Sequence, residues 1–150
     1  MPLPYPTSVG LLLASAFLLA GLLTGAWKYL EMRHSEEAVA PVYVDIAHRA
    51  ALMYAFALTL LTLLTLRTTL PETLQLALLG VLAASFAFAV ASYVVHGLLR
   101  DTDNQFRKPF VLGRHRLHGA TADVIMLLKG SAELFATGWL MLGFWQTLVM

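Results

Sequence analysis

Four long apolar stretches, separated by short polar segments, constrain this chain more than any other feature of its sequence. They run over about residues 8–30, 45–66, 72–99 and 119–148. The hydrocarbon core of a bilayer is about 30 Å thick and takes about 20 helical residues to cross, so each stretch is long enough to span it once. Of the 150 residues, 59% are hydrophobic and only 13% are charged. We therefore predict one domain, residues 1–150, that folds as an all-α integral membrane four-helix bundle.

The residues before two of these stretches predict where their helices begin. Ser8 lies where a side-chain oxygen could cap the first helix. Thr69-Leu-Pro-Glu72 matches a capping box with proline inside the first turn, and it predicts the start of the third helix. The connection between the second and third stretches is very short. We therefore expect these two helices to form an antiparallel hairpin.

The basic residues predict the orientation in the membrane. Eight of them lie in or beside the first and third connections: Lys28, Arg33, Arg49, Arg100, Arg107, Lys108, Arg114 and Arg116. Arg67 lies on the opposite side. Loops rich in lysine and arginine stay in the cytoplasm, so we expect the two larger loops to be cytoplasmic and both termini to face outward, in a bacterial inner membrane.

Composition excludes several classes of function. The net charge is only +1, and no basic stripe with interleaved aromatic residues is present, so we expect no nucleic-acid partner. The chain has no cysteine, which excludes thiolate-held clusters and thiol nucleophiles and leaves histidine or carboxylate for any metal. The start Met-Pro-Leu-Pro-Tyr-Pro carries no charged side chain, unlike a signal peptide. We therefore expect the first apolar stretch to be retained as a span.

The start of the second stretch holds the first group of titratable residues. A charge near the bilayer centre costs about 2.5 kcal/mol or more, so each such residue needs a reason. Asp45 and Arg49 lie one helical turn apart and can pair. His48 lies on a neighbouring face, and its imidazole could ligate a haem iron or another metal, with Arg49 as a second cofactor-binding residue. The alternative is an interfacial histidine that hydrogen-bonds in the headgroup region.

Tyr93 and His96 form a second group, at the same membrane depth as His48. The three residues could meet in one pocket. Tyr93 could then orient a substrate oxygen, although a tyrosine near an interface is commonly a residue of the aromatic belt. His96 lies nearer the water and is the weaker candidate.

Two further groups lie in the last third of the chain. Lys129 and Glu133 are one turn apart, about ten residues inside the fourth stretch, where an ion pair would neutralise both. They could belong to a substrate or proton path, or they could join helices. The segment 114–118 carries two arginines and two histidines that could hold metal or a haem propionate. A solvated loop attracted to anionic lipid is the favoured interpretation of this segment.

Gly21 and Gly25 form a GxxxG pair in the first stretch. Small residues at this spacing allow two helices to approach closely within a membrane. We favour packing within one subunit over a contact between subunits.

The order of these residues resembles that of the membrane-bound styrene oxide isomerases, small four-span proteins that bind haem b. The likeness covers most of the chain: Trp27 ends the first span, Ala47-His48 opens the second, and Tyr93 lies on the third at the family's spacing. The resemblance implies that His48 is the axial haem ligand and that Tyr93 lies in the substrate pocket. It also implies a homo-oligomer, a trimer, with haem near the subunit interfaces.

Three polar positions of that family differ in this chain. An asparagine is replaced by Tyr54, an aspartate by Ser85 and another asparagine by Ala89. The implied reaction is Lewis-acid opening of a hydrophobic epoxide delivered by lipid, followed by a 1,2-hydride shift that gives an aldehyde or ketone. Tyr93 or Tyr54 would hold the oxygen, so we expect these tyrosines as catalytic residues.

Two other classes of function remain open. In a haem electron-transfer or sensor subunit, His48 would still bind iron, and Tyr54, Tyr93 or His96 would supply a second axial ligand. In a small transporter or a structural subunit without cofactor, Lys129 and Glu133 would be the functional charges. Small multidrug transporters need an acidic residue in the first span, and none is present here.

Overall fold

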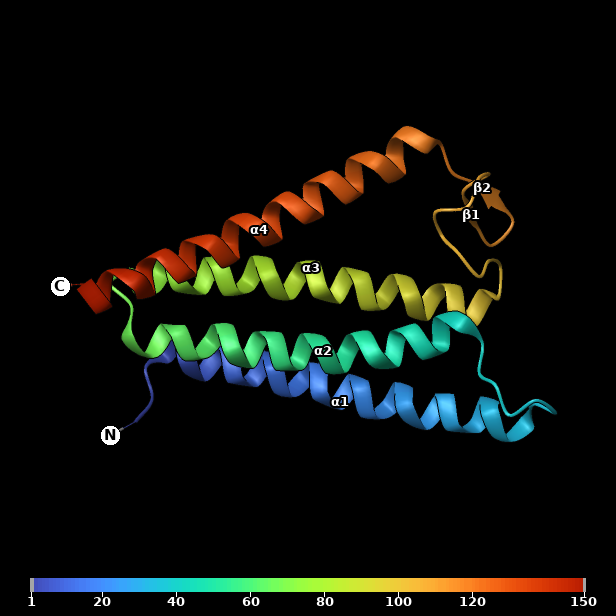
Figure 1. Cartoon of the computed structure of the whole chain (residues 1–150), viewed down its shortest axis with the longest axis horizontal. Helices are drawn as coiled ribbons and strands as arrows, with labels where there is room; N and C mark the ends of the chain where they lie inside the picture. Colours follow the sequence, from blue (N-terminus) through green and yellow to red (C-terminus); the bar gives the residue numbers. More distant parts are fainter. Residues whose placement is uncertain (1, 150) are drawn as a thin grey trace.

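The computed structural model describes residues 2–149 and confirms the all-α bundle (Figure 1). Its helices are α1 (Tyr5–His34), α2 (Val42–Leu64), α3 (Glu72–Leu99) and α4 (Gly119–Val149). All four are long and apolar enough to cross a membrane. The protein is therefore an integral membrane protein, and its two ends lie at the same end of the bundle, as four crossings require.

Prolines precede the first three helices. Pro4, Pro41 and Pro71 occupy the N-cap positions of α1, α2 and α3, with extended ψ angles of 145°, 142° and 146°. No side chain caps these helices, so the predictions for Ser8 and Thr69 are wrong. A fixed proline φ already directs the chain into the helix. The predicted start of α3 at Glu72 is right.

Close backbone approach holds α1 against α2. A Cβ added at Gly10 would come within 2.2 Å of the Thr62 hydroxyl, and one at Gly21 within 2.5 Å of Leu52. The GxxxG pair therefore packs within the chain, as favoured from the sequence. Between α1, α2 and α3 lies a core of apolar side chains that includes Phe17, Leu58, Leu79, Leu82 and Phe86.

The fourth helix leaves the bundle. In Figure 1, α4 lies against α3 near the chain's C-terminus and diverges toward its own start. Its buried residues, Ala136, Leu140 and Gly143, all belong to its second half. In its first half, Leu127 and Leu128 are 70% and 67% exposed. The two helices therefore form a wedge that is open at the start of α4.

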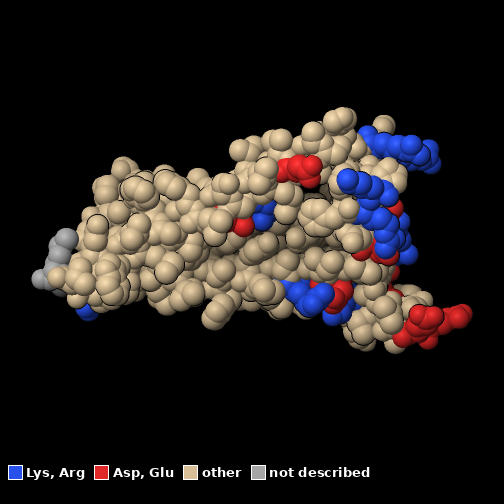
Figure 2. Space-filling model, turned by 45° about the horizontal axis from the view of Figure 1, so that its top comes forward, with Lys and Arg blue, Asp and Glu red and all other residues tan. Residues whose placement is uncertain are grey.

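The connections between the helices differ in length and in secondary structure. A short 3-10 helix, η1 (Thr65–Arg67), links α2 to α3, so these two helices form the predicted hairpin. The connection from Arg100 to His118 contains β1 (Val111–Leu112) paired antiparallel with β2 (His115–Arg116), a detail not predicted from the sequence. Charged side chains gather at this end of the molecule, while most of the flank in Figure 2 is uncharged.

Candidate functional site

The imidazole of His48 packs against α1. Its Nδ1 atom lies 2.8 Å from the carbonyl oxygen of Gly21. A Cβ at Gly25 would fall 2.8 Å and 2.9 Å from ring atoms of the same imidazole, so glycine is needed to make room for it. If Nδ1 donates its proton to the Gly21 carbonyl, Nε2 keeps its lone pair. The ring is half-buried and fixed in orientation, as a metal-ligating histidine requires.

Arg49, the next residue after His48 in α2, takes part in a charge cluster with Asp45. Its guanidinium lies 2.8 Å from a carboxylate oxygen of Asp45, which confirms the pair predicted from their spacing. Lys28 of α1 lies 2.6 Å from the other oxygen of Asp45. The arginine side chain is 64% exposed, so it is accessible to an anionic group at the membrane surface.

A polar network crosses the interior between α3 and α4. Lys129 Nζ lies 2.6 Å from Glu133 Oε1, so the predicted pair forms. The Ser85 hydroxyl of α3 donates to the same carboxylate oxygen at 2.6 Å. The lysine ammonium also lies 6.0 Å from the ring centroid of Tyr54. In a lipid environment these contacts keep both charges inside the bundle and partly neutralised.

Tyr54, which follows His48 along α2, belongs to an aromatic stack. Its ring stacks on Phe86 with centroids 4.2 Å apart and meets the edge of Phe17 at 6.3 Å. The stack connects α1, α2 and α3 in the core. It therefore fixes the Tyr54 ring against α3, with the Lys129 ammonium nearby.

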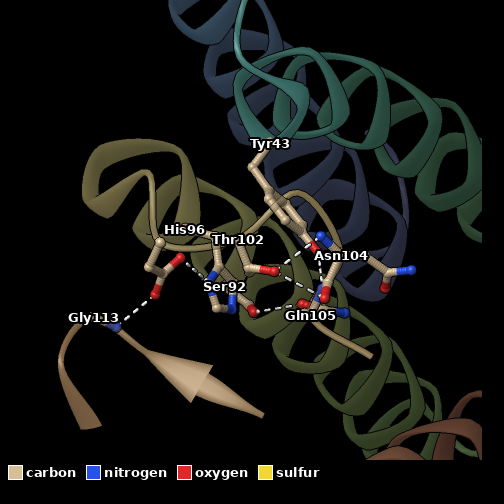
Figure 3. Close-up of polar contacts among 8 residues, drawn as sticks. Tyr43, Ser92, His96, Thr102, Asn104, Gln105 and Gly113 are labelled. Atoms are coloured by element: carbon tan, nitrogen blue, oxygen red, sulfur yellow. Dashed lines mark hydrogen bonds and ion pairs between the residues drawn. The ribbon is translucent and has the colours of Figure 1, made fainter. Parts of the chain in front are cut away.

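Tyr93 and His96 lie beside Tyr43 (Figure 3 draws Tyr43 and His96). Tyr93 stacks on Tyr43 with centroids 6.1 Å apart, and His96 meets the same ring at 5.0 Å. The Tyr43 oxygen accepts a hydrogen bond from the backbone N–H of Gln105. Within residues 2–149 no hydrogen bond, ion pair or ring contact joins His48 to Tyr54, Tyr93 or His96. His48 therefore makes no direct contact with these side chains in the described part of the chain.

His96 pairs with a carboxylate that the sequence did not point to. Its Nδ1 lies 2.8 Å from Asp101 Oδ1, and the two side chains are only 7% and 4% exposed. The other carboxylate oxygen accepts a hydrogen bond from the Gly113 N–H at 2.5 Å (Figure 3). Burial alone would raise the pKa of Asp101, but the hydrogen bonds from Gly113 and His96 together hold it below its ordinary value.

Two cavities open around this pair. One has a volume of about 530 Å³ and includes Tyr43, Arg100 and Arg107 in its wall. The other, about 440 Å³, lies between α3, α4 and the hairpin and is lined mainly by apolar side chains such as Phe88 and Ile125. His96 and Val111 belong to both walls.

Within residues 2–149, no group of three or more histidine, cysteine or acidic side chains could hold a bare metal ion. The segment 114–118 lies exposed at the hairpin, in agreement with the favoured interpretation of a solvated loop. Comparison with known protein families, with curated proteins and with solved structures finds no match to this chain.

Proposed function

We propose that this membrane protein binds haem b through His48 and isomerises a hydrophobic epoxide to a carbonyl compound. The observation that carries the proposal is the contact between His48 Nδ1 and the Gly21 carbonyl, together with the space that Gly25 leaves for the ring. In a metal-ligating histidine, a hydrogen bond from the ring nitrogen that does not bind the metal fixes the tautomer and raises the basicity of the ligand. These contacts of His48 therefore fit a histidine that would hold a haem.

The charges around His48 support the same cofactor. Haem b carries two propionates, and Arg49 and Lys28 lie within one turn of the imidazole in neighbouring helices, already bound to Asp45. Arg49 is exposed enough to exchange part of this contact for a propionate. We assign Arg49, rather than Lys28, to this role because its side chain is the more accessible one.

The polar network supports an enzyme over a passive haem carrier. The resemblance implies an aspartate where this chain has Ser85, and the Ser85 hydroxyl instead binds the Glu133 carboxylate. Glu133 would restore the missing acid from a different helix. Tyr54 lies beside the same network and replaces an expected asparagine with another hydrogen-bonding side chain.

Haem held by His48 would supply Lewis-acid chemistry for opening the epoxide. The chain's own residues would do the rest. Tyr93 or Tyr54 would donate a hydrogen bond to the epoxide oxygen and fix its orientation. The apolar helix faces would exclude water, which would otherwise capture the opening epoxide as a diol. The membrane would concentrate the substrate and deliver it laterally.

Assembly and orientation complete the proposal. We propose a trimer because the resemblance implies one, with haem near the subunit interfaces, and the half-buried His48 leaves room for neighbouring subunits to cover the cofactor. We also propose a bacterial inner membrane, with the charged end in the cytoplasm and both termini outward.

A cofactor-free subunit is the second candidate, and one observation favours it. The network of Ser85, Lys129 and Glu133 is complete without any ligand. Such a network could join helices or carry protons in a small transporter. A haem electron-transfer or sensor protein would need a second axial ligand, and His96 is already paired with Asp101.

The test is the absorption spectrum of the purified protein, expressed with added haem. We expect a Soret band in the wild type and in His34→Ala, and its loss in His48→Ala. His34 is the matched control, because its Nδ1 also lies near a backbone carbonyl, 2.7 Å from that of Leu30, but its side chain is exposed. Turnover of styrene oxide to phenylacetaldehyde would then separate an isomerase from an electron carrier. A wild type without a Soret band would overturn the proposal.

A further inference from the structure

The segment 108–118, which contains β1 and β2, carries cations that the proposed function does not use. We call this segment the basic hairpin. Lys108, Arg114 and Arg116 are its cations, and all three are exposed. The segment contains no aspartate or glutamate. None of the three cations forms an ion pair within residues 2–149, so their charge is free to meet an anion from outside the chain.

The other two cations between α3 and α4 are already paired with acids. Arg107 lies 2.8 Å from Asp103, and Arg100 lies 2.8 Å from Glu31 of α1. With these pairs counted, the connection keeps the three cations of the basic hairpin against the single carboxylate of Asp101. Figure 2 shows lysine and arginine side chains gathered along this end of the molecule, with an acidic group at a separate corner. The excess positive charge of the connection therefore belongs to the basic hairpin.

The turn of the basic hairpin is anchored to the buried pair of His96 and Asp101. Gly113 and Arg114 form the turn between β1 and β2, and Gly113 has a φ of +60°. The Gly113 N–H donates to one carboxylate oxygen of Asp101, and the other oxygen lies 2.8 Å from His96 Nδ1 (Figure 3). Both of these side chains are almost completely buried. The turn is therefore fixed at the end of α3, with the exposed Arg114 directly beside the anchored residue.

Exposed apolar side chains lie close to these cations along the chain. Phe106, Leu112 and Leu117 are 53%, 39% and 42% exposed. The connection joins α3 to α4, and both are membrane spans, so it lies at the depth of the lipid headgroups. A surface that mixes cations with apolar side chains at this depth can meet headgroup phosphates and the upper acyl chains together. The location and the composition therefore favour lipid over a soluble acidic protein.

We propose that the basic hairpin binds the phosphate groups of anionic phospholipids in the leaflet at the charged end of the bundle. Arg114 and Arg116 can each donate two parallel hydrogen bonds to one phosphate, and Lys108 adds a third charge. A zwitterionic headgroup carries its own cation beside the phosphate, so it gains less from three unpaired cations. The proposed function uses none of these residues, and the inference therefore stands independently of it.

The test is native mass spectrometry of the full-length protein in detergent, with equal amounts of phosphatidylglycerol and phosphatidylcholine that carry the same acyl chains. We expect the wild type to bind phosphatidylglycerol preferentially. Arg114→Gln and Arg116→Gln should each lower the ratio of the two bound lipids about fivefold. Arg33→Gln is the matched control, because Arg33 is exposed in the last turn of α1, at the same end of the bundle, and forms no ion pair within residues 2–149. Its ratio should equal that of the wild type.

A further variant, Asp101→Asn, separates the anchored geometry from net charge. It removes a negative charge, so a surface that acted through net charge alone would bind more phosphatidylglycerol. The same change weakens the contacts that hold the Gly113 turn, so we expect the lipid ratio to fall by roughly twofold or more.

Three results would overturn the proposal. The first is a ratio that rises in Asp101→Asn. The second is an equal loss in Arg33→Gln and Arg116→Gln, which would mean that any cation at this end serves. The third is displacement of the bound lipid by soluble glycerol phosphate or by an acidic peptide, because the surface would then recognise an anion without a membrane. Arg114 and Arg116 are exposed, so their variants should keep the wild-type melting temperature.

Discussion

The Nδ1 atom of His48 on α2 lies 2.8 Å from the carbonyl oxygen of Gly21 on α1. A helix carbonyl normally accepts from the N–H four residues later. This one also accepts from the Thr24 hydroxyl of its own helix at 3.0 Å, and His48 adds a partner from another helix. The contact makes the orientation of the imidazole depend on how closely the two helices approach. Gly25, one turn further along α1, sets that distance because a larger residue would meet the ring.

The first prediction is that Gly25→Ala lowers haem content several-fold. The new Cβ would lie 2.8 Å from the ring, so the imidazole must turn away from the Gly21 carbonyl. The measurement is the ratio of Soret to protein absorbance after reconstitution with haem. Gly80→Ala is the control, because a Cβ at Gly80 meets nothing within 4 Å. Equal haem content in the two variants would contradict a ligating role for His48 that depends on its contact with Gly21 and Gly25.

The second prediction concerns the ion pair in the membrane interior. Lys129→Met leaves the Glu133 carboxylate without its cation, and Glu133→Gln leaves the ammonium without its anion. Since the side chains are only 15% and 25% exposed, each single change should destabilise the protein by about 3 kcal/mol. The double variant should cost less than the sum of the two, as measured by unfolding in detergent. Additive losses would mean that the two charges do not interact.

The third prediction tests the packing of α1 on α2 away from the site. Gly10→Ala should lower the free energy of unfolding by roughly 1–3 kcal/mol, because its Cβ would overlap the Thr62 side chain. Gly138→Ala on α4, where a Cβ meets nothing within 4 Å, should be neutral or stabilising by up to about 1 kcal/mol. If both substitutions have the same effect on the melting temperature, helix propensity rather than contact decides the outcome.

The bundle and its local ion pairs could be predicted from the sequence. Hydropathy determines the four helices, because lipid leaves no other way to satisfy the backbone over such lengths. The pairs Asp45–Arg49 and Lys129–Glu133 follow from helical spacing alone. Contacts between helices could not be predicted in this way. Ser85 meets Glu133 across 48 residues because of how α4 packs on α3, and no local pattern records that packing.

The His96–Asp101 pair was missed for a different reason. The chain reverses between the two residues at Arg100, which ends α3 in the left-handed conformation, with φ 50° and ψ 36°. Glycine or asparagine usually marks such a position, and an arginine gives no signal of it. Because the sequence does not indicate that turn, it suggests that Asp101 is part of a solvated basic loop. A histidine in the last turn of α3, followed by an acidic residue beyond the helix end, was the available clue.

The last prediction is that acid releases the connection between α3 and α4. The pKa of Asp101 lies below its ordinary value of 3.8, so the carboxylate stabilises the folded state above that value and loses this effect as the pH falls through its lower folded-state pKa. Protonation weakens its acceptance from the Gly113 N–H. Hydrogen exchange at the Gly113 amide, corrected for its intrinsic rate, should therefore show constant protection at pH 5 and above and falling protection below about pH 3.8. In Asp101→Asn the protection should be lower at all pH values and should lack this acid step. An identical step in that variant would assign the transition to Asp103, the other carboxylate in the connection.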